Sequence, residues 1–283
     1  MQEKTAGNSI DALLPADIAR KAELIGAQKT KLPAIKLLTL AILGGAFIAL
    51  GAMFATTVLA GANGTIPFGV ARLIAGMVFS LGLILIVLGG AELFTGNALM
   101  IMALASRKVG ITALARAWSI VYCGNFIGAV GMAVLVFLAG QYHLGDGAVG
   151  RTALAIAHDK MALGFTEAFF RGILCNLLVC LAVWLALGAH STTDKVLAVI
   201  FPVSAFVVAG FEHSVANMYL VPFGMLIEAS SSAQSWLPPD AVPMRLPDFF
   251  LGLIPVTLGN IVGGGLLVGG IYWFVYLRDG PDR

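Results

Sequence analysis

The sequence GAELFTGN at residues 90–97 is echoed by GFEHSVAN at residues 210–217, and these two stretches decide the fold. Each follows a long apolar run, and each keeps the pattern Gly-x-Glu-x-x-x-x-Asn. Only the second stretch carries a histidine, His213. Because a carboxylate in an apolar segment must be paired, capped or hydrated, the repetition predicts two equivalent polar interruptions in an otherwise apolar fold.

The composition indicates a membrane protein. Of the 283 residues, 59% are hydrophobic and 11% are Asp, Glu, Lys or Arg, whereas soluble domains carry about 25% charged residues. The net charge of +2 is too small to indicate nucleic acid as a partner. All three cysteines lie in apolar runs, which favours packed thiols over disulfides or a metal site, and no cofactor is expected.

A membrane-spanning helix needs about 20 mostly apolar residues, and six segments satisfy this requirement. Their residues do not alternate with the period of a membrane β-strand, so the prediction is an all-α integral membrane protein. The second and fifth segments are too long for one straight crossing and contain the repeated motif, so both spans are expected to be broken. The segments lie at residues 35–59, 68–105, 114–139, 165–187, 196–227 and 249–277.

A second echo indicates that the chain has two related halves. The sequence GNFIG at residues 124–128 resembles GNIVG at residues 259–263. Spans one to three and four to six are therefore interpreted as two copies. Because three spans bring the chain to the opposite face of the membrane, the second copy enters inverted, an arrangement typical of transporters and channels.

The repeated motif has the chemistry of a helix break. Glycine lowers the cost of leaving helical geometry, and polar side chains can satisfy backbone groups that lipid cannot. Negative charge suits the start of the helix that follows a break. We therefore expect four residues to cap the broken helices: Glu92, Asn97, Glu212 and Asn217.

The basic residues predict the orientation. The side that contains both termini carries twelve Lys and Arg residues and the other side three, which predicts cytoplasmic termini. Near the N-terminus, Leu14, Ile18 and Ile25 recur at helical spacing, as in an amphipathic helix at the cytoplasmic mouth or a solvated tail helix. The expected organisation is an N-terminal segment (1–34), a pore domain (35–277, with half-repeats 35–139 and 165–277) and a tail (278–283).

Four long stretches resemble the formate/nitrite transporter family, most closely its formate channel branch, and together they cover nearly the whole chain. One departure is the sequence ELFTG at residues 92–96, which is closer to the nitrite branch. The stretches are IPFGVARLIAGMVFSLGLILIVLGGAELFTGN (66–97), HDKMALGFTEAFFRGILCNLLVCLAVW (158–184), FVVAGFEHSVANMYLVPFG (206–224) and IPVTLGNIVGGGLLVGGIYW (254–273).

The resemblance implies an aquaporin-like bundle of six spans per protomer in the inner membrane of a bacterium. Five protomers would form a ring in the lipid, each with its own pore for formate or a similar small anion. The resemblance also implies a cytoplasmic partner, a formate-producing glycyl-radical lyase that would bind through the N-terminal helix.

The resemblance further implies the residues of the pore. His213 would be its central histidine, Thr95 the threonine on the broken loop of span two, and Lys160 the lysine of the outer vestibule. Asn176 and Asn260 would line it with polar groups. The apolar constrictions would be formed by Phe79, Leu83, Leu93, Phe94, Val179 and Phe206.

Physical chemistry suggests how such a pore would work. An apolar slit cannot replace the hydration of an anion, so the anion must be neutralised or strongly hydrogen-bonded there. Histidine has the unperturbed pKa closest to working pH, and His213 is the one histidine in a predicted span, the other three lying in predicted loops. We expect Lys160 to attract the anion, His213 to donate a proton or a charge-assisted hydrogen bond, and Thr95 to reorient as its loop moves.

Plainer interpretations and other functions remain open. His213 could be satisfied by the backbone alone, Lys160 could extend toward the membrane interface, and the constriction residues could be simple packing. A nitrite or hydrosulfide channel would use the same residues. An aquaporin-like channel for neutral solutes would be expected to carry two Asn-Pro-Ala motifs, and a membrane enzyme a metal cluster or paired intramembrane aspartates. The sequence has none of these features, so no enzymatic activity is expected.

Overall fold

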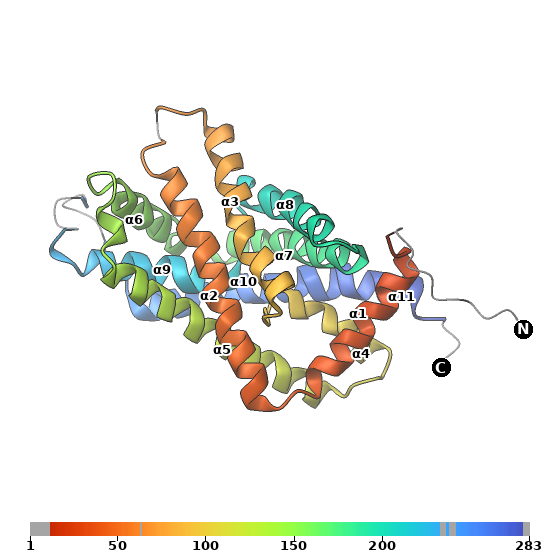
Figure 1. Ribbon diagram of the computed structural model, residues 1–283. Coiled ribbons are helices and arrows are strands. Elements are labelled where there is room, and N and C mark those ends of the chain that lie inside the picture. The colour runs from red at the N-terminus through yellow and green to blue at the C-terminus, as the bar shows by residue number, and fades with distance from the viewer. Residues whose placement is uncertain (1–11, 63, 233–235, 238–241, 280–283) are drawn as a thin grey trace, which may run out of the picture.

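The structure, a computed structural model, describes residues 12–62, 64–232, 236–237 and 242–279, and the regular elements in these ranges are helices (Figure 1). The ends of the predicted terminal segments, residues 1–11 and 280–283, lie outside them. In chain order the elements are α1 (Pro15–Thr30), α2 (Ala34–Leu59), α3 (Phe68–Gly89), η1 (Gly96–Met100), α4 (Ile101–Ala105), α5 (Ile111–Leu138), η2 (Gln141–His143), α6 (Ala148–Met161), α7 (Phe165–Gly188), α8 (Thr192–Val208), α9 (Ser214–Glu228), α10 (Leu246–Asn260), the π-helical η4 (Ile261–Gly270) and α11 (Ile271–Tyr276).

The predicted spans are present, and the second and fifth are broken. Helices α2, α3, α5, α7 and the continuous unit from α10 to α11 are each long and apolar enough to cross a membrane. The fifth predicted span consists of α8 and α9, of 17 and 15 residues, separated by the non-helical residues 209–213. In the second span, α3 ends before the non-helical residues 90–95, and η1 and α4 follow. The predicted all-α membrane fold is therefore confirmed.

The glycine of each repeated motif lies where its helix ends. Gly90 has φ of 79° and Gly210 has φ of 71°. This left-handed conformation is unfavourable for residues with a Cβ atom and easy for glycine. Each glycine therefore lets the chain turn out of the helix axis and continue as a non-helical segment inside the bundle.

The two halves pack their helices in the same way. Helix α2 packs against α5, and α7 packs against α10 and η4. A Cβ atom on Gly128 would lie 1.9 Å from the carbonyl oxygen of Ile42, and one on Gly263 would lie 2.1 Å from that of Ile173. Both helix pairs therefore touch backbone to backbone at equivalent positions, which relates spans one and four as well as spans three and six.

The repeat also includes a short helix in front of each half. Helix α6 occupies a segment predicted as a loop, and it packs against α9 and α2. Helix α1, the predicted N-terminal helix, packs against η1, α4 and α7. Lys29 of α1 and Lys160 of α6 are separated by 131 residues, as are Ile42 and Ile173. The two short helices lie at opposite ends of the bundle (Figure 1), as an inverted repeat requires.

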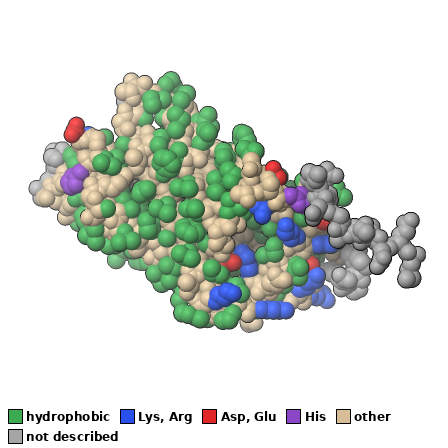
Figure 2. All heavy atoms as spheres, viewed as in Figure 1, with side chains coloured by type: hydrophobic (Ala, Val, Ile, Leu, Met, Phe, Trp, Pro, Cys, Tyr) green, Lys and Arg blue, Asp and Glu red, His purple; other side chains and the backbone are tan. Residues whose placement is uncertain are grey.

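Large apolar side chains cover the outside of the bundle. Phe68, Leu138 and Phe201 are each more than 70% exposed, at 78%, 74% and 75%. Figure 2 shows hydrophobic side chains over the middle of the visible face, and Lys and Arg side chains gathered around α1 and α4. An apolar belt of this size is suited to lipid or to neighbouring protomers rather than to water.

The close contact between α2 and α5 predicts that Gly128→Val will severely destabilise the fold. Its added atoms would overlap the backbone of α2, and overpacking of this kind costs about 3 kcal/mol or more. Gly131→Val is the matched control, because an added Cβ at Gly131 on the same helix meets no atom within 4 Å. Thermal unfolding in detergent should show a large loss for the first variant only, and equal melting temperatures would contradict the packing.

Candidate functional site

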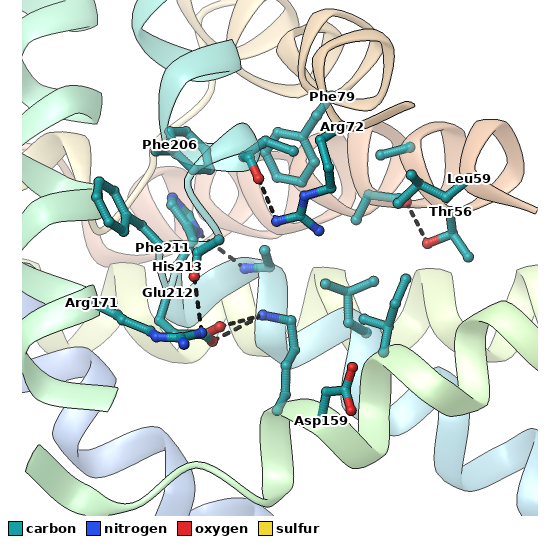
Figure 3. Close-up of a pocket in the computed structure, with 18 of the residues that line it drawn as sticks. Thr56, Leu59, Arg72, Phe79, Asp159, Arg171, Phe206, Phe211, Glu212 and His213 are labelled. Carbon is teal, nitrogen blue, oxygen red and sulfur yellow. Dashed lines mark hydrogen bonds and ion pairs between the residues drawn. The ribbon is translucent and has the colours of Figure 1, made fainter. Parts of the chain in front are cut away.

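Two pockets share α3 as a wall, and we name each after the short helix beside it. The α6 pocket has a volume of about 200 Å³ (Figure 3), and the α1 pocket has about 360 Å³. Phe79 lines the first and Leu83, one helical turn further along α3, lines the second. The pockets therefore approach each other from the two ends of the bundle. Among their polar lining residues are Arg72, Asp159, Lys160, Arg171, Glu212 and His213 in the α6 pocket and Lys21, Lys29, Glu92, Asn97 and Lys195 in the α1 pocket.

Thr95 and His213 meet where the two breaks face each other. Thr95 Oγ1 lies 3.0 Å from His213 Nε2, and both residues are buried, with exposures of 0% and 2%. One comes from the break of the second span and the other from the break of the fifth. The contact therefore joins the two halves, and it brings together the histidine expected at the centre of a pore and the threonine expected on the broken loop of span two.

The hydrogen bonds of His213 define its tautomer. The backbone N–H of Ala216 donates to His213 Nδ1 at 3.1 Å, so His213 is the N-cap of α9. Because Nδ1 accepts, the ring hydrogen of the neutral imidazole is on Nε2. Nε2–H therefore donates to Thr95 Oγ1, and His213 presents a hydrogen-bond donor toward the centre of the protein.

Apolar side chains flank this contact on both sides. On the α6 side, the rings of Phe79 and Phe206 meet edge to face with centroids 5.6 Å apart, and Phe206 stacks on His213 at 6.0 Å. On the α1 side, Leu83 and Leu93 line the pocket and are each 2% exposed. Four of the predicted constriction residues thus line the two pockets on either side of the Thr95–His213 contact.

The other two predicted constriction residues line neither pocket. The ring of Phe94 packs edge to face against Trp118 and Tyr122, with centroids 6.0 and 4.9 Å away. Val179 is 1% exposed within the apolar core. Both positions are therefore occupied by core packing, and a constricting role for them stays a prediction.

Glu212 is held by side chains. Its carboxylate lies 2.9 and 3.0 Å from Lys160 Nζ, and it accepts a hydrogen bond of 2.7 Å from Asn217 Nδ2. The glutamate is only 4% exposed. Lys160, predicted as an anion-attracting lysine, is thus half of an ion pair, and that pair carries no net charge.

The first half repeats this arrangement with a lysine that the sequence reading missed. Glu92 lies 2.9 Å from Lys29 Nζ and accepts a 2.8 Å hydrogen bond from Asn97 Nδ2. Lys29 also donates to Asn97 Oδ1. The 131-residue spacing between Lys29 and Lys160 is the signal that could have identified it. The side chain that caps α9 is that of His213, and each glutamate binds a lysine and an asparagine. A capping role for Glu92, Asn97, Glu212 and Asn217 stays a prediction.

Asn260 satisfies the backbone of the second break. Its Nδ2 donates to the carbonyl oxygens of Gly172 at 2.8 Å and Glu212 at 2.9 Å, and its Oδ1 accepts from the N–H of Ser214 at 2.9 Å. The side chain is fully buried. One amide therefore ties the extended segment beside His213 to α7.

Asn125 does the same for the first break. Its Nδ2 donates to the carbonyl oxygens of Ala41 and Glu92, and its Oδ1 accepts from the N–H of Phe94. The predicted echo between residues 124–128 and 259–263 is therefore a repeated hydrogen-bond pattern.

Asn176 connects the two arrangements, because its Nδ2 donates to the carbonyl oxygens of Thr95 and Asn260. Asn176 and Asn260 line neither of the two pockets. A pore-lining role for these two asparagines stays a prediction.

Lysines give the α1 pocket its basic character. Lys21 Nζ donates to the carbonyl oxygen of Leu187 at 2.7 Å, which ties α1 to the end of α7. Burial, and secondarily the neighbouring charge of Lys195, lower the pKa of Lys21. The α1 pocket therefore holds a group of ammonium ions beside the Lys29–Glu92 pair.

Comparison with known proteins agrees with this geometry. The family described as formate/nitrite transporter matches residues 16–274. The formate channel FocA of Escherichia coli K12 is 43% identical over 280 residues, covering 97% of this chain and 98% of that protein. A probable formate transporter of Methanothermobacter thermautotrophicus is 38% identical, covering 94% of this chain and 97% of its own.

Solved structures give the same result. A pentameric formate channel with formate bound is similar with a TM-score of 0.81 and 41% identity, covering 87% of this chain and 98% of that one. An ion channel of the same family has a TM-score of 0.78 and 28% identity, covering 92% and 98%. These relatives are channels and transporters, and they share the fold over nearly its whole length.

The buried Lys160–Glu212 pair predicts a specific pattern in a double-mutant cycle. Lys160→Met leaves a buried carboxylate without its cation and should lower stability by about 3 kcal/mol. Lys160→Met combined with Glu212→Gln removes both charges and should recover most of that loss. Arg20→Met, which breaks an exposed ion pair with Asp17, is the control and should cost less than about 1 kcal/mol. Thermal unfolding in detergent measures all three, and a double variant no more stable than Lys160→Met would contradict the pairing.

Proposed function

This chain belongs to the formate/nitrite transporter family, and on that basis we propose that it forms a channel for formate and related small monovalent anions. Because its relatives are channels and transporters, it is a transport protein rather than an enzyme. As its fold is similar to that of a pentameric formate channel, we expect five protomers, each with its own pore. The observation that carries the proposal is the Thr95–His213 contact between two pockets that contain basic side chains.

The pore would run from one pocket to the other past this contact. An anion in either pocket can keep much of its hydration, whereas the rings of Phe79 and Phe206 and the side chains of Leu83 and Leu93 offer it no hydrogen bonds. Transfer of an isolated anion into such surroundings is strongly unfavourable. The anion therefore needs a donor at the narrow point, and His213 supplies one.

His213 would act as a neutral hydrogen-bond donor. Protonation of the ring requires a hydrogen on Nδ1, and this atom already accepts the N–H of Ala216. The imidazolium would lose that cap, so we favour donation of the Nε2 hydrogen bond over transfer of a proton. The anion would replace Thr95 Oγ1 as the acceptor, and Thr95 would rotate away to admit it. A hydrogen bond to a charged acceptor is worth roughly twice a neutral one.

The basic residues support the proposed orientation. Exposed Lys and Arg side chains gather around α1 and α4 (Figure 2), the side to which the sequence assigns twelve basic residues. We therefore propose that the α1 pocket opens to the cytoplasm and the α6 pocket to the outside of a bacterial inner membrane. A lyase bound to α1 stays a prediction.

Nitrite is a second candidate substrate. The sequence ELFTG at residues 92–96 is closer to the nitrite branch of the family. Formate and nitrite are both bent anions with two oxygens on one atom, so the same donor suits both. Flux of formate, nitrite, hydrosulfide and acetate into vesicles that contain the purified protein separates the candidates, and absence of formate flux would overturn the proposed function.

The role of His213 predicts the behaviour of His213→Asn. The asparagine side chain can still cap α9, so the variant should fold, but it is too short to present a donor at the position of Nε2. Formate influx into vesicles under an inward pH gradient should fall about tenfold or more, in line with loss of one hydrogen bond to an anion.

The control is His143→Asn, at an exposed residue of η2 outside both pockets, and it should leave influx unchanged. A His213→Asn variant that melts at the temperature of the unmodified protein and transports formate at its rate would remove His213 from the mechanism.

A further inference from the structure

The α6 pocket contains one cation that the proposed transport steps do not use. Of the three basic side chains that line it, Lys160 is paired with Glu212 and Arg171 with Glu167. Among the described residues, no carboxylate lies within 4.0 Å of the third, Arg72. Arg72 is therefore the basic side chain of this pocket that forms no ion pair within 4.0 Å in the described part of the chain.

The guanidinium of Arg72 is held in place, but some of its N–H donors have no hydrogen-bond partner in the described part of the chain. Its Nη2 donates to the carbonyl oxygen of Val207 at 2.6 Å, and its Cζ lies 5.9 Å from the ring centroid of Phe68. Its Nε is buried and, within the described part of the chain, has no hydrogen-bond partner. A guanidinium has five N–H donors, so a fixed group that makes one hydrogen bond within the described part of the chain keeps donors available for a ligand.

The backbone around Arg72 leaves space for this placement. A Cβ atom on Gly210 would lie 3.4 Å from Arg72 Nη2, so the glycine of the second break lets the guanidinium approach the end of α8. In Figure 3 the guanidinium of Arg72 points into the pocket, with Asp159 and Arg171 on the far side. Asp159 is exposed and forms no ion pair with Arg72 within 4.0 Å.

Arg72 also lies on the path to the apolar slit. It precedes Phe79 by seven residues on α3, which is two turns, or about 10 Å along the helix. It lines the α6 pocket and also an adjoining cavity of about 590 Å³ between α6 and the connection from α2 to α3. Because Arg72 lines both cavities, an anion that moves from this cavity into the α6 pocket comes close to its side chain.

We propose that Arg72 is a binding site for anions with two oxygens on one atom, such as formate and nitrite, and that it favours them over hydrosulfide at the α6 side of the pore. This proposal rests on the proposed function. A planar guanidinium matches two coplanar oxygens with two parallel N–H donors, whereas an ammonium acts as a point charge. Hydrosulfide has one acceptor atom and gains little from the second donor.

The repeat makes this site specific to one end of the pore. Position 192, which is 120 residues after Arg72 and related to it by the spacing of the two motifs, is Thr192. The described basic residues that line the α1 pocket are lysines: Lys21, Lys29 and Lys195. Both ends attract anions, but geometric selection between anions is confined to the end that carries the guanidinium.

Arg72→Lys tests this proposal. The lysine keeps the positive charge and a donor for the carbonyl oxygen of Val207, but it lacks the two parallel N–H donors of the guanidinium. The half-saturating concentrations for formate and nitrite influx should rise about tenfold or more, a loss typical of one hydrogen bond to a charged group. The half-saturating concentration for hydrosulfide influx should change less than twofold. Arg245→Lys is the control, because Arg245 is an exposed arginine that pairs with Asp248 and lines neither pocket. It should leave all three values unchanged.

The outcomes separate this proposal from the proposed function. An equal rise for all three anions in Arg72→Lys, or no rise for any, would overturn the binding site. If the lysine variant does not fold, Arg72→Gln removes the charge and should weaken formate and nitrite more than hydrosulfide, and equal weakening would again overturn it. Unmodified protein that conducts hydrosulfide but no formate would instead refute the proposed function.

Discussion

A backbone N–H or carbonyl inside a membrane must find its partner within the protein, and the pore of this protein depends on how two broken helices meet that requirement. The amide side chains of Asn125 and Asn260 each bind two carbonyl oxygens and one N–H around a break. The non-helical segments that result carry Thr95 and His213 to a common point. The site therefore exists because two buried amides replace the hydrogen bonds that a continuous helix would make.

The buried charges, like the buried backbone groups, find their partners within the protein. Glu92 and Glu212 each have a lysine and an asparagine as partners, and neither carboxylate is left alone in the apolar bundle. Pairing makes these carboxylates tolerable at membrane depth, but it also cancels the lysine charges that an anion would otherwise meet. Attraction of the substrate then depends on the cations that remain unpaired, and in the α6 pocket that cation is Arg72.

Much of the fold follows from the sequence, because long apolar runs and a repeated motif are local signals. The six spans, the two breaks and the inverted repeat were all predictable from them. Helix α6 was not, because its 14 residues mix apolar and polar side chains and lie between spans. The partners of the glutamates were missed for a related reason. A helix cap is a contact between residues close in sequence, so a motif can suggest it. Lys29 and Glu92 are more than 60 residues apart in the sequence, and only the tertiary structure brings them together.

The asymmetry between the halves explains why the pore has one histidine. The spacing of 120 residues that relates the two motifs makes Leu93 the counterpart of His213 and Val215 the counterpart of Thr95. Leu93 lines the α1 pocket beside Leu83, so the position that supplies the donor in one half supplies part of the apolar barrier in the other. A second histidine at that position would put a polar, hydratable ring in the barrier and weaken the selection for anions that His213 can stabilise. The symmetric framework sets the geometry, and the unequal residues at equivalent positions give it a function.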